Sequence, residues 1–188
     1  MGGTPLSDLC DLAPIAVGVD VGRLLSGLGC VHRAVHVFAD RPHAVPPTVA
    51  EAAARQVEAA QVMVLHDGRR EDGGRREGSR ALLLHLNPPA TVLLDAEDRD
   101  STSLTNLTRP DPGWAAAGPA DRLDIAAPVV HRRGIDHGVT SVLWRSRRPL
   151  HPERLAESLP QVMPAVVRSR GHLWMATHLG RSVSSVSG

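Results

Sequence analysis

Cys30, His32 and His36 form a compact group of side chains that bind transition metals. Thiolate and imidazole groups suit zinc, and three protein ligands leave one position of a tetrahedral site for another ligand. His32 and His36 would face the same way on a helix, because residues four apart share a helix face. The sequence therefore predicts a candidate zinc site here. The alternative is that these are ordinary loop and surface residues beside the apolar residues at 35, 37 and 38; no fourth ligand follows from spacing.

Other catalytic chemistry is limited by what the chain lacks. All 21 of its Lys and Arg residues are arginine, and it contains no tyrosine. A phosphate-binding lysine of a P-loop, a Schiff-base lysine and a catalytic tyrosine therefore cannot come from this polypeptide. The sequence also contains no GxSxG, HExxH or CxxC motif. We expect no catalytic residues.

The charge is distributed unevenly along the chain, although the formal net charge is only +1. Residues 1–124 carry 17 acidic residues and 12 arginines, a net charge of −5, whereas residues 125–188 carry 3 acidic residues and 9 arginines, a net charge of +6. A basic region favours an acidic partner such as RNA, or contact with the acidic front half. The alternative is that these arginines lie on solvent-exposed strand faces.

The compartment follows from cysteine usage and from the start of the chain. Cys10 and Cys30 are its two cysteines and provide no disulfide framework, which is typical of a reducing compartment. The first residues lack a basic and then apolar signal pattern, and no apolar run approaches the length of a membrane span. We expect a cytoplasmic protein without membrane association.

The front half shows helices alternating with short apolar strands. Thr48 and Glu51 form a capping box that begins a helix over 49–60. The other expected elements are strands at 14–20, 61–65 and 91–94, helices at 21–28 and 81–86, and a solvated glycine-rich loop at 69–80. This alternation predicts an α/β lobe with a small parallel sheet.

The rear half reads as strand, helix and returning strand in one sheet. An extended strand is expected over 137–147, and Pro152 marks the first turn of a helix that Pro160 and Pro164 would stop. Residues 165–178 return to strand chemistry, with Gly171 predicting a bulge or a close backbone approach. The last nine residues look like the start of another strand.

The rear half also resembles a known family. The phrases GVTSVLWRSRRPLHPERL and VVRSRGHLWMATH are similar to the start of the C-terminal domain of CobW-type proteins, which are GTP-dependent metallochaperones and cobalamin-biosynthesis-like proteins of zinc and cobalt handling. In that family a strand ending in RRP, a hydrophobic residue and HPxR precedes a helix and an RxKGxxWxAT strand. Arg170 stands where the family most often has lysine. The order of elements in the front half resembles the rear part of the family's GTPase domain.

The resemblance implies an incomplete relative. It begins downstream of the family's P-loop, and the base-reading NKxD motif is degenerate here, with His66, Asp67 and Arg69 among the matching residues. We expect no autonomous GTP binding, because the carboxylate that would contact guanine is replaced by a cation. The implied architecture is a partial P-loop-type lobe lacking the P-loop (1–112), a linker (113–136) and a truncated α+β CobW-like C-terminal domain (137–188).

The resemblance implies a role in zinc or cobalt homeostasis, as a metallochaperone-related binding or accessory module. Zinc is then the expected cofactor and GTP is not, and the expected partners are a metal-requiring client protein or a full-length CobW-like relative. Two other functions stay open. One is a GTPase completed in trans by a partner that carries the P-loop, and the other is an arginine-rich module that binds RNA or the ribosome through residues 132–181.

Overall fold

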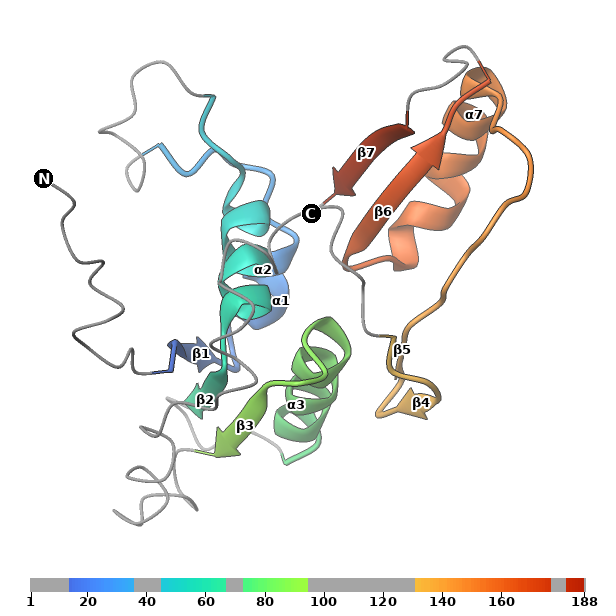
Figure 1. The fold of residues 1–188 in the computed structure, drawn as a ribbon. Helices are drawn as coiled ribbons and strands as arrows, with labels where there is room; N and C mark the ends of the chain where they lie inside the picture. The colour runs from blue at the N-terminus through green and yellow to red at the C-terminus, as the bar shows by residue number, and fades with distance from the viewer. Residues whose placement is uncertain (1–13, 36–44, 67–72, 95–130, 177–181, 188) are drawn as a thin grey trace, which may run out of the picture.

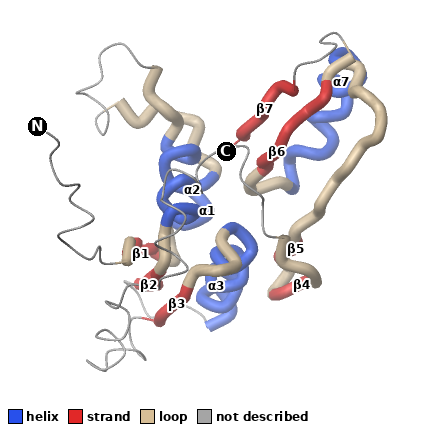
Figure 2. Tube along the Cα trace, viewed as in Figure 1, coloured by secondary structure: helices blue, strands red, loops and turns tan. Residues whose placement is uncertain are grey.

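The computed structural model describes residues 14–35, 45–66, 73–94, 131–176 and 182–187. The described front half is a small parallel sheet with helices, and the described rear half consists of two antiparallel strand pairs and a helix (Figure 1). Figure 2 shows the helices and strands along the chain trace. The mixed α/β class that the sequence predicts is confirmed.

The front sheet has three parallel strands in the order β1-β2-β3. These strands are β1 (Ala16–Asp20), β2 (Val62–His66) and β3 (Thr91–Leu94). Helices α1 (Leu24–Leu28) and α2 (Val49–Ala59) lie between β1 and β2 in the sequence, and α3 (Gly73–Leu86) lies between β2 and β3. Each strand matches its predicted range to within two residues, whereas α1 begins three residues later than predicted.

Helix α2 begins as its sequence predicts. The backbone N–H of Glu51 donates to the Oγ1 of Thr48 at 3.1 Å, and Thr48 has the extended backbone of an N-cap. Ala50, Ala54 and Val57 are buried along one face of this helix. The local capping signal and the apolar face therefore select the same helix.

The core lies between the parallel sheet and its helices. Met63 of the central strand and Leu83 of α3 are fully buried. Around them is one cluster of buried apolar residues: Val19, Val21, Leu24, Leu28, Ala54, Val57, Ala60, Leu65, Leu82 and Ala90. Val139, from the rear half of the chain, packs against this cluster. The core of the front half thus extends to the beginning of the rear half.

The prediction of a solvated loop over 69–80 is wrong for its second part. Residues 73–80 form the first half of α3, which continues to Leu86, while residues 67–72 lie outside the described residues. Ser79, Ala81 and Leu82 are buried. Their packing stabilises a helix that can extend backward through Arg75, Arg76 and Glu77, despite the cost of about 1 kcal/mol for a glycine inside a helix.

In the rear half, the expected order of strand, helix and strand is present. β4 (Ile135–Asp136) and β5 (Val139–Thr140) form a hairpin, α7 (Pro152–Val162) leads into the 3-10 helix η2 (Met163–Ala165), and β6 (Ser169–Trp174) pairs antiparallel with β7 (Ser182–Ser187). β7 confirms the strand expected at the end of the sequence. The linker boundary near residue 137 stays a prediction, because residues 113–130 lie outside the described residues.

The expectation of one continuous strand over 137–147 in the same sheet as the returning strand is wrong. β5 ends at Thr140 and pairs with β4, whereas β6 pairs with β7. Within the described residues, the β-type pairing between the chain after β5 and the chain after β6 is limited to an isolated parallel bridge between Leu150 and Met175. Gly138, at φ 79°, allows the tight turn that folds β5 back on β4, so the pairing is local.

Two expectations about single residues in this half are also wrong. Pro160 lies inside α7 and does not stop it; the helix is solvent-exposed there, so water can satisfy the carbonyl that a proline leaves unbonded. Gly171 pairs with Ser185 in a continuous ladder, so there is no bulge, and no atom lies within 4 Å of where a Cβ would stand. Its φ of 154° explains the glycine instead, because other residues rarely adopt that value.

Candidate functional site

The candidate metal ligands Cys30 and His32 lie on a loop that is fixed to the start of α2. The N–H of Ala50 donates to the carbonyl of Cys30 at 3.0 Å, and the N–H of Val49 donates to the carbonyl of His32 at 2.8 Å. The N–H of Ala34 donates to the carbonyl of Pro47 at 2.9 Å. These bonds hold the loop along the N-terminal end of α2.

The chain bends at His32, and the Nδ1 of His32 lies 3.5 Å from the Sγ of Cys30. Two ligands of a tetrahedral zinc ion, with Zn–S near 2.3 Å and Zn–N near 2.0 Å, are ~3.5 Å apart. The two donor atoms therefore have the identity and the separation that one zinc ion requires.

The third predicted ligand, His36, lies outside the described residues. The premise that a helix would align His32 with His36 is wrong at its start, because Arg33 forms an antiparallel bridge with Thr48 and the loop is extended there. Within the described ranges, no three His, Cys, Asp or Glu side chains gather closely enough to hold a metal ion. The structure therefore brings together two of the three candidate ligands.

The residues that the sequence analysis matched to a guanine-reading motif begin at the carboxyl end of the central strand. His66 is the last residue of β2, and its carbonyl accepts a hydrogen bond from the N–H of Val21 at 3.1 Å. Asp67 and Arg69 lie outside the described residues. His66 is exposed at the edge of the sheet where nucleotide-binding α/β folds place ligand contacts.

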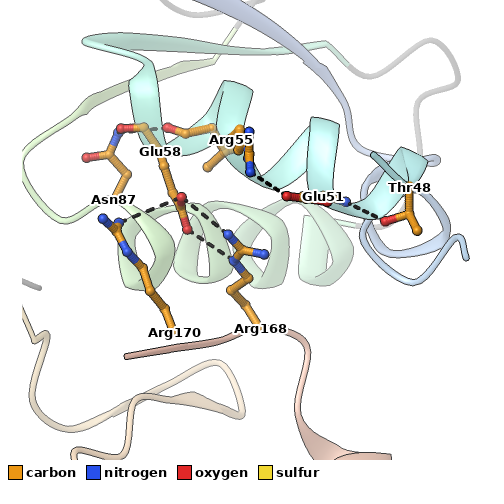
Figure 3. A network of polar contacts seen from close by, with 8 residues as sticks. Thr48, Glu51, Arg55, Glu58, Asn87, Arg168 and Arg170 are labelled. Atoms are coloured by element: carbon orange, nitrogen blue, oxygen red, sulfur yellow. Dashed lines mark hydrogen bonds and ion pairs between the residues drawn. The ribbon is translucent and has the colours of Figure 1, made fainter. Parts of the chain in front are cut away.

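The C-terminal end of α2 carries a buried charge cluster that the sequence analysis missed. The carboxylate of Glu58 accepts two hydrogen bonds from Arg168, one from Nε to Oε1 at 3.1 Å and one from Nη2 to Oε2 at 3.4 Å (Figure 3). The Nη1 of Arg170 lies 3.7 Å from Oε2. The side chains of Glu58, Arg168 and Arg170 are only 8%, 7% and 15% exposed. This cluster joins α2 to β6 across 110 residues of sequence.

A signal for this cluster exists in the sequence. Arg170 lies in β6 and Arg168 directly precedes that strand, two residues earlier, and Glu58 directly follows the buried Val57 on α2. Predicting the contact between Glu58 and the two arginines would have required knowing that β6 lies against α2. No local sequence pattern indicates that packing. Asn87 completes the same end of α2: its side-chain amide donates to the carbonyls of Val57 at 2.7 Å and Ala60 at 2.8 Å.

A second polar contact joins the two halves at α3. The Nδ1 of His85 lies 2.8 Å from the Oγ of Ser141, and the Nε2 of His131 lies 2.7 Å from the carbonyl of Ser141. His85 is buried, and its Nε2 has no hydrogen-bond partner within the described residues. On the nearby hairpin, Arg132 and His137 both contact the carboxylate of Asp136.

Two side chains around this contact have shifted pKa values. Burial, reinforced by the positive charges of Arg132 and His131 and opposed by Asp136, lowers the pKa of His85 below 6.5. The hydrogen bond from His137, with the charges of His137, Arg132 and His85, lowers the pKa of Asp136 below 3.8 against the opposing effect of burial. At neutral pH, His85 is therefore uncharged and Asp136 is ionised.

Within the described ranges, every helix is too short or too polar to cross a lipid bilayer. The longest, α3, contains 14 residues.

Comparison with known proteins finds similarity to CobW-type sequences. Residues 139–187 match the family described as the cobalamin synthesis protein cobW C-terminal domain. Curated relatives include a zinc chaperone of Mycobacterium tuberculosis and an uncharacterized protein of Mycobacterium bovis, each 26% identical over 163 residues. The match covers 87% of this chain but only 38% of each relative's length. No solved structure matches the chain.

The matched region begins at β5 and includes α7, β6 and β7, the elements that carry the two sequence phrases similar to CobW-type proteins. The relatedness to the zinc chaperone covers most of the rest of the chain as well. Residues 139–187 thus match the C-terminal domain of the CobW-type family, in agreement with the resemblance of the two phrases.

Proposed function

We propose that this chain binds zinc for delivery to a client protein and does so without hydrolysing GTP by itself. The observation that carries the proposal is the Cys30–His32 pair, with donor atoms 3.5 Å apart on a loop fixed to α2. The match of residues 139–187 to the CobW C-terminal domain and the similarity to a protein named a zinc chaperone support zinc as the cargo.

The chemistry of the pair fits a transfer site. His36 follows His32 closely enough in sequence to supply a third ligand, and three protein ligands leave the fourth zinc position open to water or to a client's side chain. Cys30 is partly accessible and His32 is exposed, so an incoming ligand can reach the ion. A site of this kind exchanges its metal more readily than a closed four-ligand site.

The loop is organised before any metal binds, because its backbone is already hydrogen-bonded to the start of α2. Pre-organisation reduces the conformational entropy that the loop loses when a ligand binds. The backbone bonds to Val49 and Ala50 also place the pair at one end of α2, the helix that reaches β6 through Glu58 at its other end.

Zinc titration of the metal-free chain against a chromophoric chelator tests the proposal. Cys30→Ser, His32→Ala and His36→Ala should each weaken zinc binding by more than the about 10–100-fold that loss of an outer-shell partner costs. His151→Ala is the matched control, because His151 is exposed and its side chain makes no capping hydrogen bond at α7. With cobalt as a probe, the thiolate charge-transfer band should disappear in Cys30→Ser alone.

Equal zinc affinity of the Cys30→Ser and unchanged proteins would refute the site. The second part of the proposal is tested separately with labelled GTP, in the presence and absence of zinc. We expect no retention of the nucleotide, because the chain has no lysine to hold its phosphates. Saturable GTP binding by the isolated chain would overturn this part while leaving the zinc site unaffected.

A further inference from the structure

The segment 141–149 is an extended stretch of chain that runs alone between β5 and α7. Figure 1 shows it as a single strand-like trace that runs from the hairpin to the helix. The carbonyl of Ser141 accepts from His131, and Ser146 and Arg148 form a local turn contact. Within the described residues, no hydrogen bond joins the backbone of Val142, Leu143, Trp144 or Arg145 to another strand. Their donors and acceptors are available to a partner.

The side chains of this segment are unusually apolar for an exposed strand. Val142, Leu143 and Trp144 are 83%, 57% and 67% exposed. Because side chains alternate along an extended chain, Val142 and Trp144 share one face, while Leu143 and Arg145 share the other. Arg147 and Arg148 follow where the chain bends. One face thus offers apolar contact, and the opposite face combines an apolar residue with a positive charge that is followed by two more.

The positive charges on the segment have no acidic neighbours within the described part of the chain. Arg145, Arg147 and Arg148 are exposed, and none has a carboxylate partner among the residues that the structure describes. Arg168 and Arg170 differ, because both contact the buried Glu58. The segment therefore presents three adjacent positive charges with unpaired backbone groups, an arrangement that favours a partner bringing carboxylates in an extended form.

We propose that the segment 141–149 binds an extended acidic stretch of another polypeptide, which adds to it as a β-strand. Backbone hydrogen bonds supply affinity in this mode of recognition, and alternating side chains supply specificity. Apolar side chains of the partner pack on Val142 and Trp144, and carboxylates of the partner form ion pairs with Arg145 and Arg147.

Two other occupants fit the segment less well. Single-stranded RNA would use the arginines and stack on Trp144, but it would leave Val142, Leu143 and the free backbone amides without partners. A second copy of this chain would place arginine-rich strands against each other, and like charges directly opposite are destabilising. An acidic polypeptide satisfies the backbone, the apolar residues and the charges together.

Fluorescence anisotropy with the full chain tests this surface. The probe is a labelled peptide of alternating valine and aspartate, compared with one in which lysine replaces aspartate and with a short oligouridylate. We expect the acidic peptide to bind and the basic peptide to bind at least about tenfold more weakly, because its charges would face Arg145 and Arg147. N-methylation of the acidic peptide along one edge should abolish binding, and along the other edge should leave it unchanged.

The protein variant is Arg145→Glu with Arg147→Glu, which should reverse the preference between the two peptides. The matched control is Arg133→Glu with Arg154→Glu, two exposed arginines outside the segment, and its binding should stay within about twofold of the unchanged protein. Cys30→Ser should bind the peptide normally, so this surface and the zinc site succeed or fail separately.

Three results would overturn the inference. They are equal binding of the two peptides, tighter binding of oligouridylate than of the acidic peptide, and self-association of the chain that Arg145→Glu with Arg147→Glu abolishes. Insensitivity to N-methylation on both edges would likewise exclude strand addition.

Discussion

Replacing Glu58 with glutamine should strongly destabilise the contact between α2 and β6. The carboxylate contacts Arg168 through both oxygens and also lies 3.7 Å from Arg170, and all three side chains are at most 15% exposed. Glu58→Gln leaves two buried cations without their shared carboxylate while keeping the side-chain shape. Breaking a buried ion pair by removing one partner costs about 3–5 kcal/mol, so we expect a loss in that range.

The same helix provides the control. Glu51 pairs with Arg55 on its exposed face, four residues apart, and such a pair contributes only about 0.3–0.5 kcal/mol. Glu51→Gln should therefore change the free energy of unfolding by about a tenth of the effect of Glu58→Gln. Both variants are measured by urea denaturation followed by circular dichroism, and hydrogen exchange of the β6 amides reports whether β6 separates first.

Equal effects of the two substitutions would refute this reasoning, since it attributes the larger cost to the burial of Glu58 and to its contacts with two buried arginines. A second test replaces Glu58 and Arg168 together with apolar residues of similar volume. If the cost of Glu58→Gln comes from stranded charge, the double replacement should recover much of the lost stability, because a buried pair is often replaceable by apolar packing.

Three further predictions concern single contacts. Asn87→Ala should cost about 1–3 kcal/mol in urea denaturation, because the carbonyls of Val57 and Ala60 lose their buried donor; an unchanged midpoint would contradict it. Thr48→Ala should cost about 1 kcal/mol by removing the N-cap of α2, and Thr48→Ser should restore most of it. The lowered pKa of His85 predicts that its contribution to stability is complete above pH 6.5 and declines as the pH falls from 6.5 toward the folded-state pKa. His85→Gln should remove that slope from stability measured against pH, and an unaltered slope would show that other groups cause it.

Local signals predicted the elements that local interactions stabilise. The capping box at Thr48, the apolar face of α2 and the short apolar runs of β2 and β3 were each visible in the sequence, and each element is present. Such elements combine a period, a cap and a turn within a few residues, so their sequence and their packing agree.

Errors arose where distant contacts decide the conformation. The glycines and arginines at 73–80 indicated a loop, but burial of Leu82 and Leu83 against the sheet stabilises the helix that contains them. The strand expected over 137–147 needed a neighbour to pair with, and the hairpin β4-β5 takes up only its first residues. In the candidate zinc site, the sequence indicated the ligand types. The loop conformation that brings Cys30 close to His32 depends on backbone hydrogen bonds to α2.

The two halves of the chain are joined by three kinds of contact in the described residues, and this bears on what the proposed zinc loop can do. Glu58 contacts Arg168 and Arg170 by charge, His85 contacts Ser141 by a hydrogen bond, and Val139 packs into the front core. α2 takes part at both ends, since its first residues hold the Cys30–His32 loop and Glu58 holds β6.

A change in the position of α2 would therefore alter both the loop and the rear half. Coupling between two sites needs an element whose arrangement both sites affect, and α2 is such an element here. If zinc binding draws Cys30 and His32 closer to the start of the helix, Glu58 is the residue through which β6 would respond. Because the contact is reciprocal, weakening it with Glu58→Gln should change zinc affinity even though Glu58 lies at the opposite end of α2 from the metal-binding loop. Unchanged zinc affinity in a folded Glu58→Gln protein would show that α2 supports the two sites independently.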